Sequence, residues 1–268
     1  MIDKTIITRA DDCASSLSTN AGIQKAVSGG LIKNVSVMGN CRYLDDAAGL
    51  FAGRKDICFG MHATLNAEWS KVKWGSAAPP DLVPSLLDAQ GFLHPNPAVF
   101  RTHHPNPEEV LREYDAQLDA ITRAGFRVSY VDSHMFAEAC IEGIPEQIQE
   151  WIRKKGLIDH SVFYRELPKV PDATRSTASF ENLLRTLGAG QYVLIFHPCE
   201  MSPESLMMGN DSEDGAEVAA CRDDEMRLCA DPNARALMEK YGFQAIRYDE
   251  AEASVGPKGL NAKDEKRD

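Results

Sequence analysis

The chain has 268 residues, of which 43% are hydrophobic and 26% charged, and its formal net charge is -11 at pH 7. This composition is typical of an ordinary globular protein, and the acidic balance argues against binding nucleic acid through its phosphates. No apolar run approaches the roughly 18 residues that a membrane-spanning helix needs. The N-terminus lacks the basic and apolar segments of a secretory signal, so we expect a cytoplasmic protein without a membrane partner, whose seven scattered cysteines are reduced.

Short apolar runs alternate with segments of helical periodicity along the chain. Their apolarity is continuous rather than alternating, as in strands of a parallel sheet that are covered on both faces. These predicted strands lie at residues 5–8, 35–38, 57–65, 128–131, 162–164, 192–196 and 243–248.

The clearest predicted helix covers residues 107–124. It begins with Pro107 and two glutamates, which suit a first helical turn, and it is followed by Gly125. Similar signals predict helices over residues 15–27, 145–155, 179–187 and 232–241. The alternation of strands and helices predicts an α/β domain, built either as a parallel barrel or as a doubly wound sheet.

Three segments fall outside this alternation. Residues 70–104 are rich in proline and contain Trp74, and long loops of this kind often form lids or substrate walls. Residues 201–216 follow a predicted strand and are rich in small and polar side chains. Residues 254–268 are charged and small, so we expect a disordered tail after a single catalytic domain over residues 1–253.

Unusual polar residues stand where several predicted strands end. Because the carboxyl ends of parallel strands meet at one edge of an α/β sheet, we expect these side chains to converge there. Asp12 follows the first strand, His62 lies late in the third, and His134 follows the fourth. Two imidazoles and one carboxylate form a set that binds one divalent metal ion and leaves positions for water and substrate. Histidine ligands favour zinc, manganese, nickel or cobalt over magnesium, but they do not exclude magnesium. Zinc and magnesium are therefore both candidates for the bound ion.

Three further strand-end side chains have candidate chemical roles. Asp11 can take a proton from the attacking water as general base, and His197 can protonate a leaving amine or stabilise an oxyanion. Asp132 can orient an imidazole or contact the substrate. The alternatives are that Asp132 caps a helix beside an exposed His134, and that His197 is a buried neutral residue before Pro198.

At these residues the sequence resembles the YdjC-like carbohydrate deacetylases, which include chitooligosaccharide deacetylases. The opening strand of that family ends in Asn-Ala-Asp-Asp-Phe-Gly, and residues 9–14 here read Arg-Ala-Asp-Asp-Cys-Ala. The later family motifs Gly-x-His, Leu-Asp-Ser-His and Cys-His-Pro are matched by residues 60–62, 131–134 and 196–198. Their order and approximate spacing hold from about residue 5 to about residue 250.

The resemblance implies a single-domain (β/α)-barrel variant, TIM-like and with about seven strands. It implies a metal-dependent hydrolase that removes the acetyl group from an N-acetylated amino sugar or oligosaccharide. The metal ligands would be Asp12, His62 and His134, with Asp11 as base and His197 as acid or oxyanion partner. Family members are often homodimers, which the sequence neither supports nor excludes.

The resemblance also gives candidate substrate contacts. Trp69 and Trp74 lie in a segment that part of the family shares, and an aromatic face there could pack against a sugar ring. Arg165 ends the fifth predicted strand and is a further candidate. Arg9 replaces the family's asparagine and could lower the pKa of Asp11 or meet an anionic substrate.

Cys13 and Met135 also differ from the residues that the family has at these positions, and both stand close to the predicted ligands. Together with Arg9 they leave two alternatives to the deacetylase open. One is a metal-dependent hydrolase of a different ester or amide. The other is a barrel that binds a carbohydrate or metabolite with weak or no catalysis.

Overall fold

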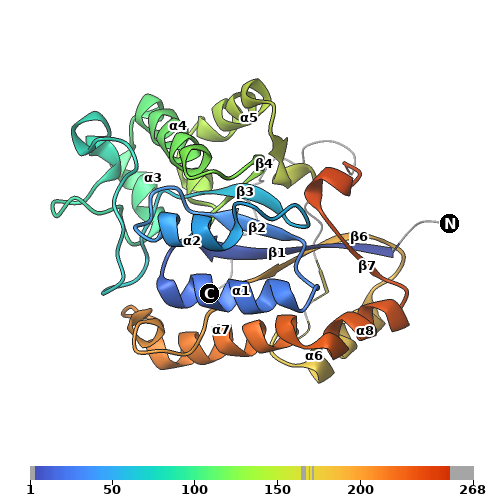
Figure 1. The fold of residues 1–268 in the computed structure, drawn as a ribbon. Coiled ribbons are helices and arrows are strands. Elements are labelled where there is room, and N and C mark those ends of the chain that lie inside the picture. Colours follow the sequence, from blue (N-terminus) through green and yellow to red (C-terminus); the bar gives the residue numbers. More distant parts are fainter. Residues whose placement is uncertain (1–3, 164–166, 169, 171, 254–268) are drawn as a thin grey trace.

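The computed structural model describes residues 4–163, 167, 168, 170 and 172–253 (Figure 1). Seven parallel strands form one sheet in the order β5-β4-β3-β2-β1-β6, and β7 pairs with the first half of β1. No pairing joins β5 to β6 among the described residues, so the sheet is a half-barrel. The strands are β1 (Lys4–Cys13), β2 (Asn34–Val37), β3 (Cys58–Ala63), β4 (Val128–Ser133), β5 (Ile158–Asp159), β6 (Gly190–Phe196) and β7 (Gln244–Ile246).

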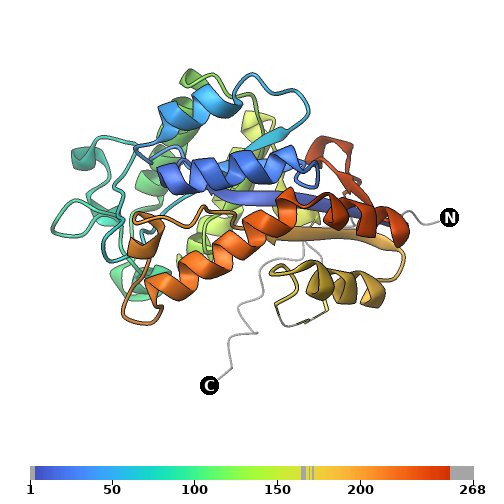
Figure 2. The same cartoon turned by 60° about the horizontal axis from the view of Figure 1, so that its bottom comes forward.

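Eight α-helices surround this sheet in the described part of the chain. In Figure 1, α4 and α5 lie above the strands, and α1, α7 and α8 lie below them. Figure 2 shows α7 running beside α1, against which it packs. The helices are α1 (Leu17–Ser28), α2 (Leu44–Phe51), α3 (Phe100–His103), α4 (Pro107–Arg123), α5 (Ile144–Lys155), α6 (Thr177–Thr186), α7 (Gly215–Ala230) and α8 (Pro232–Lys240). Each helix in the described ranges is too short or too polar to cross a lipid bilayer.

The five predicted helices are confirmed with small changes at their ends, whereas α2, α7 and the four-residue α3 were not predicted. The helix α7 has 16 residues but no clear apolar stripe, because its buried face includes Asp223 and Glu225. Its N-cap is Asp214, whose side chain accepts hydrogen bonds from the backbone of Ala216 and Glu217. The predicted loop at residues 201–216 therefore ends where this helix begins.

The first strand is longer than predicted. It pairs with β6 as far as Ala10 and rejoins β2 at Cys13, with a register shift between these two residues. The strand therefore contains Asp11 and Asp12 instead of ending before them. Asp12 has a φ of 64°, in the left-handed region, at this irregularity. Such bulges re-aim side chains, and here the bulge separates the directions of two adjacent carboxylates.

The predicted strand at residues 162–164 is wrong in position. The strand β5 comes earlier, and a 3-10 turn over His160–Phe163 follows it. The Asp159 carboxylate accepts a hydrogen bond from the Ser161 backbone at 2.8 Å, which turns the chain out of the strand. Residue 164 lies outside the described residues, as do Arg165 and the predicted tail at residues 254–268.

The proline-rich segment at residues 70–104 is mainly loop, as predicted, with three short 3-10 turns and the four-residue α3. Its start is fixed by the buried carboxylate of Glu113 on α4, which accepts hydrogen bonds from the backbone of Ala77 and Ala78 at 2.8 and 2.9 Å. Residues near this start, including Trp74, are thereby held against the carboxyl end of the sheet.

Candidate metal centre

Three donor atoms meet at the carboxyl ends of β1, β3 and β4. Asp12 Oδ1 lies 3.3 Å from His62 Nε2 and 3.4 Å from His134 Nδ1, and the two ring nitrogens are 3.2 Å apart. His134 directly follows β4, and its backbone N–H donates to the Ala63 carbonyl at 3.0 Å. All three side chains are buried. The structure thus brings together the three residues that the sequence nominated as ligands.

The size of this triangle suits a single metal ion. Ligands about 2.0–2.2 Å from a tetrahedral zinc ion lie about 3.3–3.6 Å from one another. Asp12 Oδ1 is buried and has no hydrogen-bond partner among the described residues. An unpaired buried acceptor is costly, and a cation at the centre of the triangle would compensate it. The donor set therefore fits a divalent ion.

A second layer of charged groups holds each of the three residues. Asp132 Oδ2 is 3.0 Å from His62 Nδ1, and Glu68 Oε2 is 2.8 Å from His134 Nε2. The other two ring nitrogens, Nε2 of His62 and Nδ1 of His134, face the shared centre and lie 3.2 Å apart. The third residue, Asp12, accepts a hydrogen bond from the Arg222 guanidinium at 2.7 Å on its other oxygen.

This second layer makes metal binding dependent on pH. Burial lowers the pKa of His134, but the Glu68 and Asp12 carboxylates raise it more, to about 9. A ligand nitrogen must be deprotonated, so we expect zinc binding at pH 7 to release at least one proton. Despite the burial of His62, the Asp132 and Asp11 carboxylates also raise its pKa well above the ordinary value. Metal affinity should therefore fall at least about tenfold per unit as the pH drops from 9 toward 7. Calorimetric titration in buffers of different ionisation enthalpy measures this release, and an affinity independent of pH in that range would contradict the assignment.

Arg9 lies beneath the centre and joins two further carboxylates. Its Nε and Nη2 donate to the two oxygens of Asp11 at 2.6 and 2.7 Å, and Nη2 is 2.9 Å from Asp132 Oδ2. Nη1 donates to the Tyr248 hydroxyl at 3.0 Å. Arg9 is only 1% exposed, so the structure places it among carboxylates and away from the surface where a substrate would arrive.

Asp11, His62 and Asp132 form a second group of close donor atoms. This group does not fit a cation, because the guanidinium of Arg9 already contacts both aspartates. The two adjacent aspartates thus have different surroundings. Asp12 faces the two imidazoles, whereas Asp11 is paired with arginine.

His197 follows β6 and is partly exposed. Its backbone N–H donates to Glu225 Oε2 at 2.6 Å, and its Nδ1 lies 4.0 Å from the same oxygen. The side chain is 42% exposed, which excludes the alternative of a buried neutral histidine. Among the described residues, no hydrogen bond links His197 to Asp12 or to the two buried imidazoles.

The two tryptophans are buried, with exposed fractions of 5% for Trp69 and 6% for Trp74. The Trp74 ring meets His134 edge to face, and its Nε1 donates to the Asn66 carbonyl at 2.7 Å. The Arg222 guanidinium lies over Trp69, 5.5 Å from the ring centroid. The rings therefore support His134 and Arg222, and the expected open aromatic face is not present in this structure.

The sequence did not nominate Glu68, Arg222 or Glu225. Glu68 lies in the loop after β3, a position that no periodicity marks. Arg222 and Glu225 are on α7. Because that helix was not predicted, nothing indicated that their side chains point toward the strand ends. The only signal for Arg222 and Glu225 was the cluster of charged residues within 221–225, and such a cluster is equally typical of a solvent-exposed surface.

The fold and the centre together define an α/β half-barrel with an Asp-His-His donor set at the carboxyl ends of its strands. Residues 5–240 match the family described as YdjC-like protein, and the chain belongs to this family. The match covers both the opening strand with its two aspartates and the late strand that precedes His197.

Curated relatives include two proteins named carbohydrate deacetylase. The one from Brevibacillus brevis is 32% identical over 139 residues, covering 50% of each chain. The one from Enterococcus faecalis is 28% identical over 135 residues, covering 50% of this chain and 49% of the relative. The chain thus spans about half the length of the curated relatives it matches.

Solved structures confirm the fold. A protein from Enterococcus faecalis V583, provisionally described as a cellobiose-phosphate cleavage protein, has a TM-score of 0.75 at 19% identity, covering 92% of this chain and 98% of that one. A family 4 carbohydrate esterase from Streptomyces lividans, solved in complex with acetate, has a TM-score of 0.50 at 11% identity, covering 96% of this chain and 100% of that one. The prediction of a barrel variant is therefore confirmed.

Proposed function

We propose that the protein is a metal-dependent hydrolase that removes the acetyl group from an N-acetylated amino sugar or oligosaccharide. The observation that carries this proposal is the triangle of donor atoms on Asp12, His62 and His134, in which all three atoms face one centre. The names of the curated relatives support the sugar as substrate and the acetyl group as the group released.

In this proposal the three residues bind one divalent ion, zinc or magnesium. A bound divalent ion polarises a carbonyl oxygen and lowers the pKa of water in its coordination sphere. Asp132 and Glu68 keep the two imidazoles oriented and basic. Despite the burial of Asp12, the Arg222 guanidinium holds the pKa of its carboxyl well below the usual range, so Asp12 is ionised as a ligand must be.

Asp11 is the proposed general base and His197 the proposed acid. Arg9 donates hydrogen bonds to both oxygens of Asp11, which fixes the carboxylate in place. The Glu225 carboxylate, 4.0 Å from Nδ1 of His197, is placed to orient this imidazole. The exposed position of His197 allows it to meet a leaving amine that arrives from solvent.

One observation favours a second candidate function. Both oxygens of Asp11 are engaged in an ion pair with the buried Arg9, an arrangement that favours a carbohydrate-binding half-barrel without turnover. Hydrolysis of a different ester or amide is the third alternative. The cytoplasmic location stays a prediction from the sequence, and the homodimer stays an expectation that rests on the family resemblance alone.

Acetate release from a panel of acetamido sugars, compared with activated esters, separates these functions. We expect release from acetamido sugars that stops on chelation and returns when zinc or magnesium is added back. Ester cleavage alone would support the alternative hydrolase. Sugar binding without acetate release over long incubation would support the binding half-barrel.

A further inference from the structure

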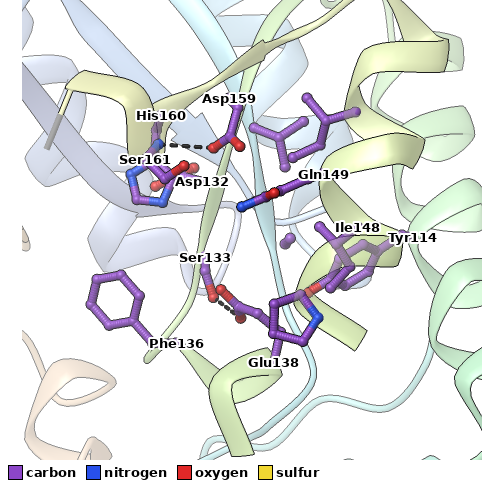
Figure 3. A pocket seen from close by; sticks show the side chains of 14 residues that line it. Tyr114, Asp132, Ser133, Phe136, Glu138, Ile148, Gln149, Asp159, His160 and Ser161 are labelled. Atoms are coloured by element: carbon purple, nitrogen blue, oxygen red, sulfur yellow. Dashed lines mark hydrogen bonds between the residues drawn. The ribbon is translucent and has the colours of Figure 1, made fainter. Parts of the chain in front are cut away.

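A cavity of about 220 Å³ lies beside the metal centre, between the ends of β4 and β5 and the helices α4 and α5 (Figure 3). The two strands pair only at Tyr130 with Ile158 and at Val131 with Asp159. Beyond Asp159 the chain leaves the strand in a 3-10 turn, and His160 and Ser161 of this turn also line the cavity. Much of the lining is apolar and comes from Ala63, Tyr114, Val131, Phe136, Ile148 and Ile152.

Two buried polar atoms belong to residues that line this cavity and have no hydrogen-bond partner among the described residues. They are Asp132 Oδ1 and Ser161 Oγ. Asp132 is only 1% exposed, and its other oxygen already contacts His62 and Arg9. An unpaired buried acceptor costs about 1–3 kcal/mol. Both residues line one cavity, and a hydrogen-bonding molecule bound there would supply the partners that these two atoms lack.

The remaining polar groups make the cavity suitable for a neutral molecule. Arg9 already compensates the charge of Asp132, so the free oxygen calls for a donor and not for a counter-charge. Burial and the nearby Arg9 cation lower the pKa of His160 to about 4, which leaves its ring uncharged at neutral pH. The Ser133 hydroxyl donates to the Glu138 carboxylate, and the Gln149 side chain points into the space (Figure 3).

The cavity has apolar walls with hydrogen-bonding groups on one side, and a sugar ring likewise has apolar faces and a hydrogen-bonding edge. Its C–H faces are apolar, and its edge carries hydroxyl groups that both donate and accept. At about 30 Å³ for each water, the cavity has the room of about seven waters, which is the scale of a single ring and not of a longer chain. Figure 3 shows the Asp132, His160 and Ser161 side chains facing Tyr114 and Ile148 across the space.

We propose that this cavity is a subsite for one neutral sugar ring of the substrate, with one ring hydroxyl donating to Asp132 Oδ1 and another bonded to Ser161 Oγ. The choice of a sugar rests on the proposed function. Asp132 also contacts His62, so the ring in this subsite adjoins the metal centre where an amide on the same molecule would react.

Calorimetric titration of the metal-loaded protein with cellobiose tests the subsite. Cellobiose is neutral and has no acetyl group, so it cannot be deacetylated. We expect wild-type protein to bind it, Ser161→Ala to bind it about five- to tenfold more weakly, and Ile148→Trp, which fills the cavity, not to bind it. Because Ser161 Oγ is unpaired, Ser161→Ala should not lower the thermal unfolding midpoint. Ser28→Ala, on the exposed end of α1, is the matched control and should bind like wild type.

No binding to the wild type, or wild-type affinity in Ser161→Ala or in folded Ile148→Trp, would overturn the subsite and indicate a cavity that holds only water. Acetate release measured on the same samples separates this failure from that of the proposed function. Release without any effect of the cavity variants refutes only the subsite. Cellobiose binding that depends on Ser161, without release from acetamido sugars, refutes only the deacetylase.

Discussion

The variant His62→Ala is expected to lose both stoichiometric metal binding and acetate release. A bound metal ion contributes several kcal/mol of transition-state stabilisation, and about 4 kcal/mol corresponds to about a thousandfold in rate. We therefore expect kcat/KM to fall at least about a thousandfold. His62 supplies one corner of the donor triangle and also contacts Asp132, so its removal disturbs both layers of the centre.

The control for this variant is His103→Ala. His103 is exposed on α3 and takes no part in the donor triangle, so metal content and acetate release should stay at wild-type values. Circular dichroism and thermal unfolding show whether His62→Ala still folds. A folded His62→Ala protein that binds one metal ion with unchanged affinity would remove His62 from the centre.

The variant Arg9→Met is expected to lower the free energy of unfolding by about 3–5 kcal/mol. The substitution keeps an unbranched side chain of similar length but leaves Asp11 and Asp132 buried without their shared cation. Removing one partner of a buried ion pair is strongly destabilising because the remaining charge is left uncompensated. Urea unfolding at one fixed metal concentration measures the effect, since a bound ion itself adds stability.

Two further variants test the cause of this loss. Adding Asp11→Asn to Arg9→Met removes one of the two uncompensated charges and should recover part of the lost free energy of unfolding. The double variant should therefore be more stable than the sum of the two single effects would give. Arg54→Met removes an arginine whose partner Asp56 is 61% exposed, and it should stay close to wild type. Equal losses in Arg9→Met and Arg54→Met would show that the buried carboxylates do not need Arg9.

Local patterns in the sequence predicted most of the fold. The parallel strands were visible because both of their faces are covered, and α4 and α5 were visible through their first turns and the glycines that follow them. The fifth strand was misplaced because the turn at Asp159 depends on one side-chain hydrogen bond. The helix α7 was missed because it buries Asp223 and Glu225 in place of apolar residues.

The donor triangle could be nominated because its three residues stand at strand ends, and parallel strands bring their ends together. Their partners could not be nominated in that way. Arg222 is 210 positions from Asp12 in the sequence, and Glu68 is 66 positions from His134. Which of the two adjacent aspartates faces the imidazoles follows from the bulge in β1, a feature that depends on pairing with β2 and β6.

The most direct test of the centre is the metal content of the purified protein, measured by elemental analysis after dialysis against zinc. We expect one ion per chain in the wild type, none in Asp12→Asn, and one in Asp11→Asn, which changes the neighbouring carboxylate that is paired with Arg9. A wild-type protein without metal would contradict the assignment. So would an ion retained in Asp12→Asn, or one lost in a folded Asp11→Asn.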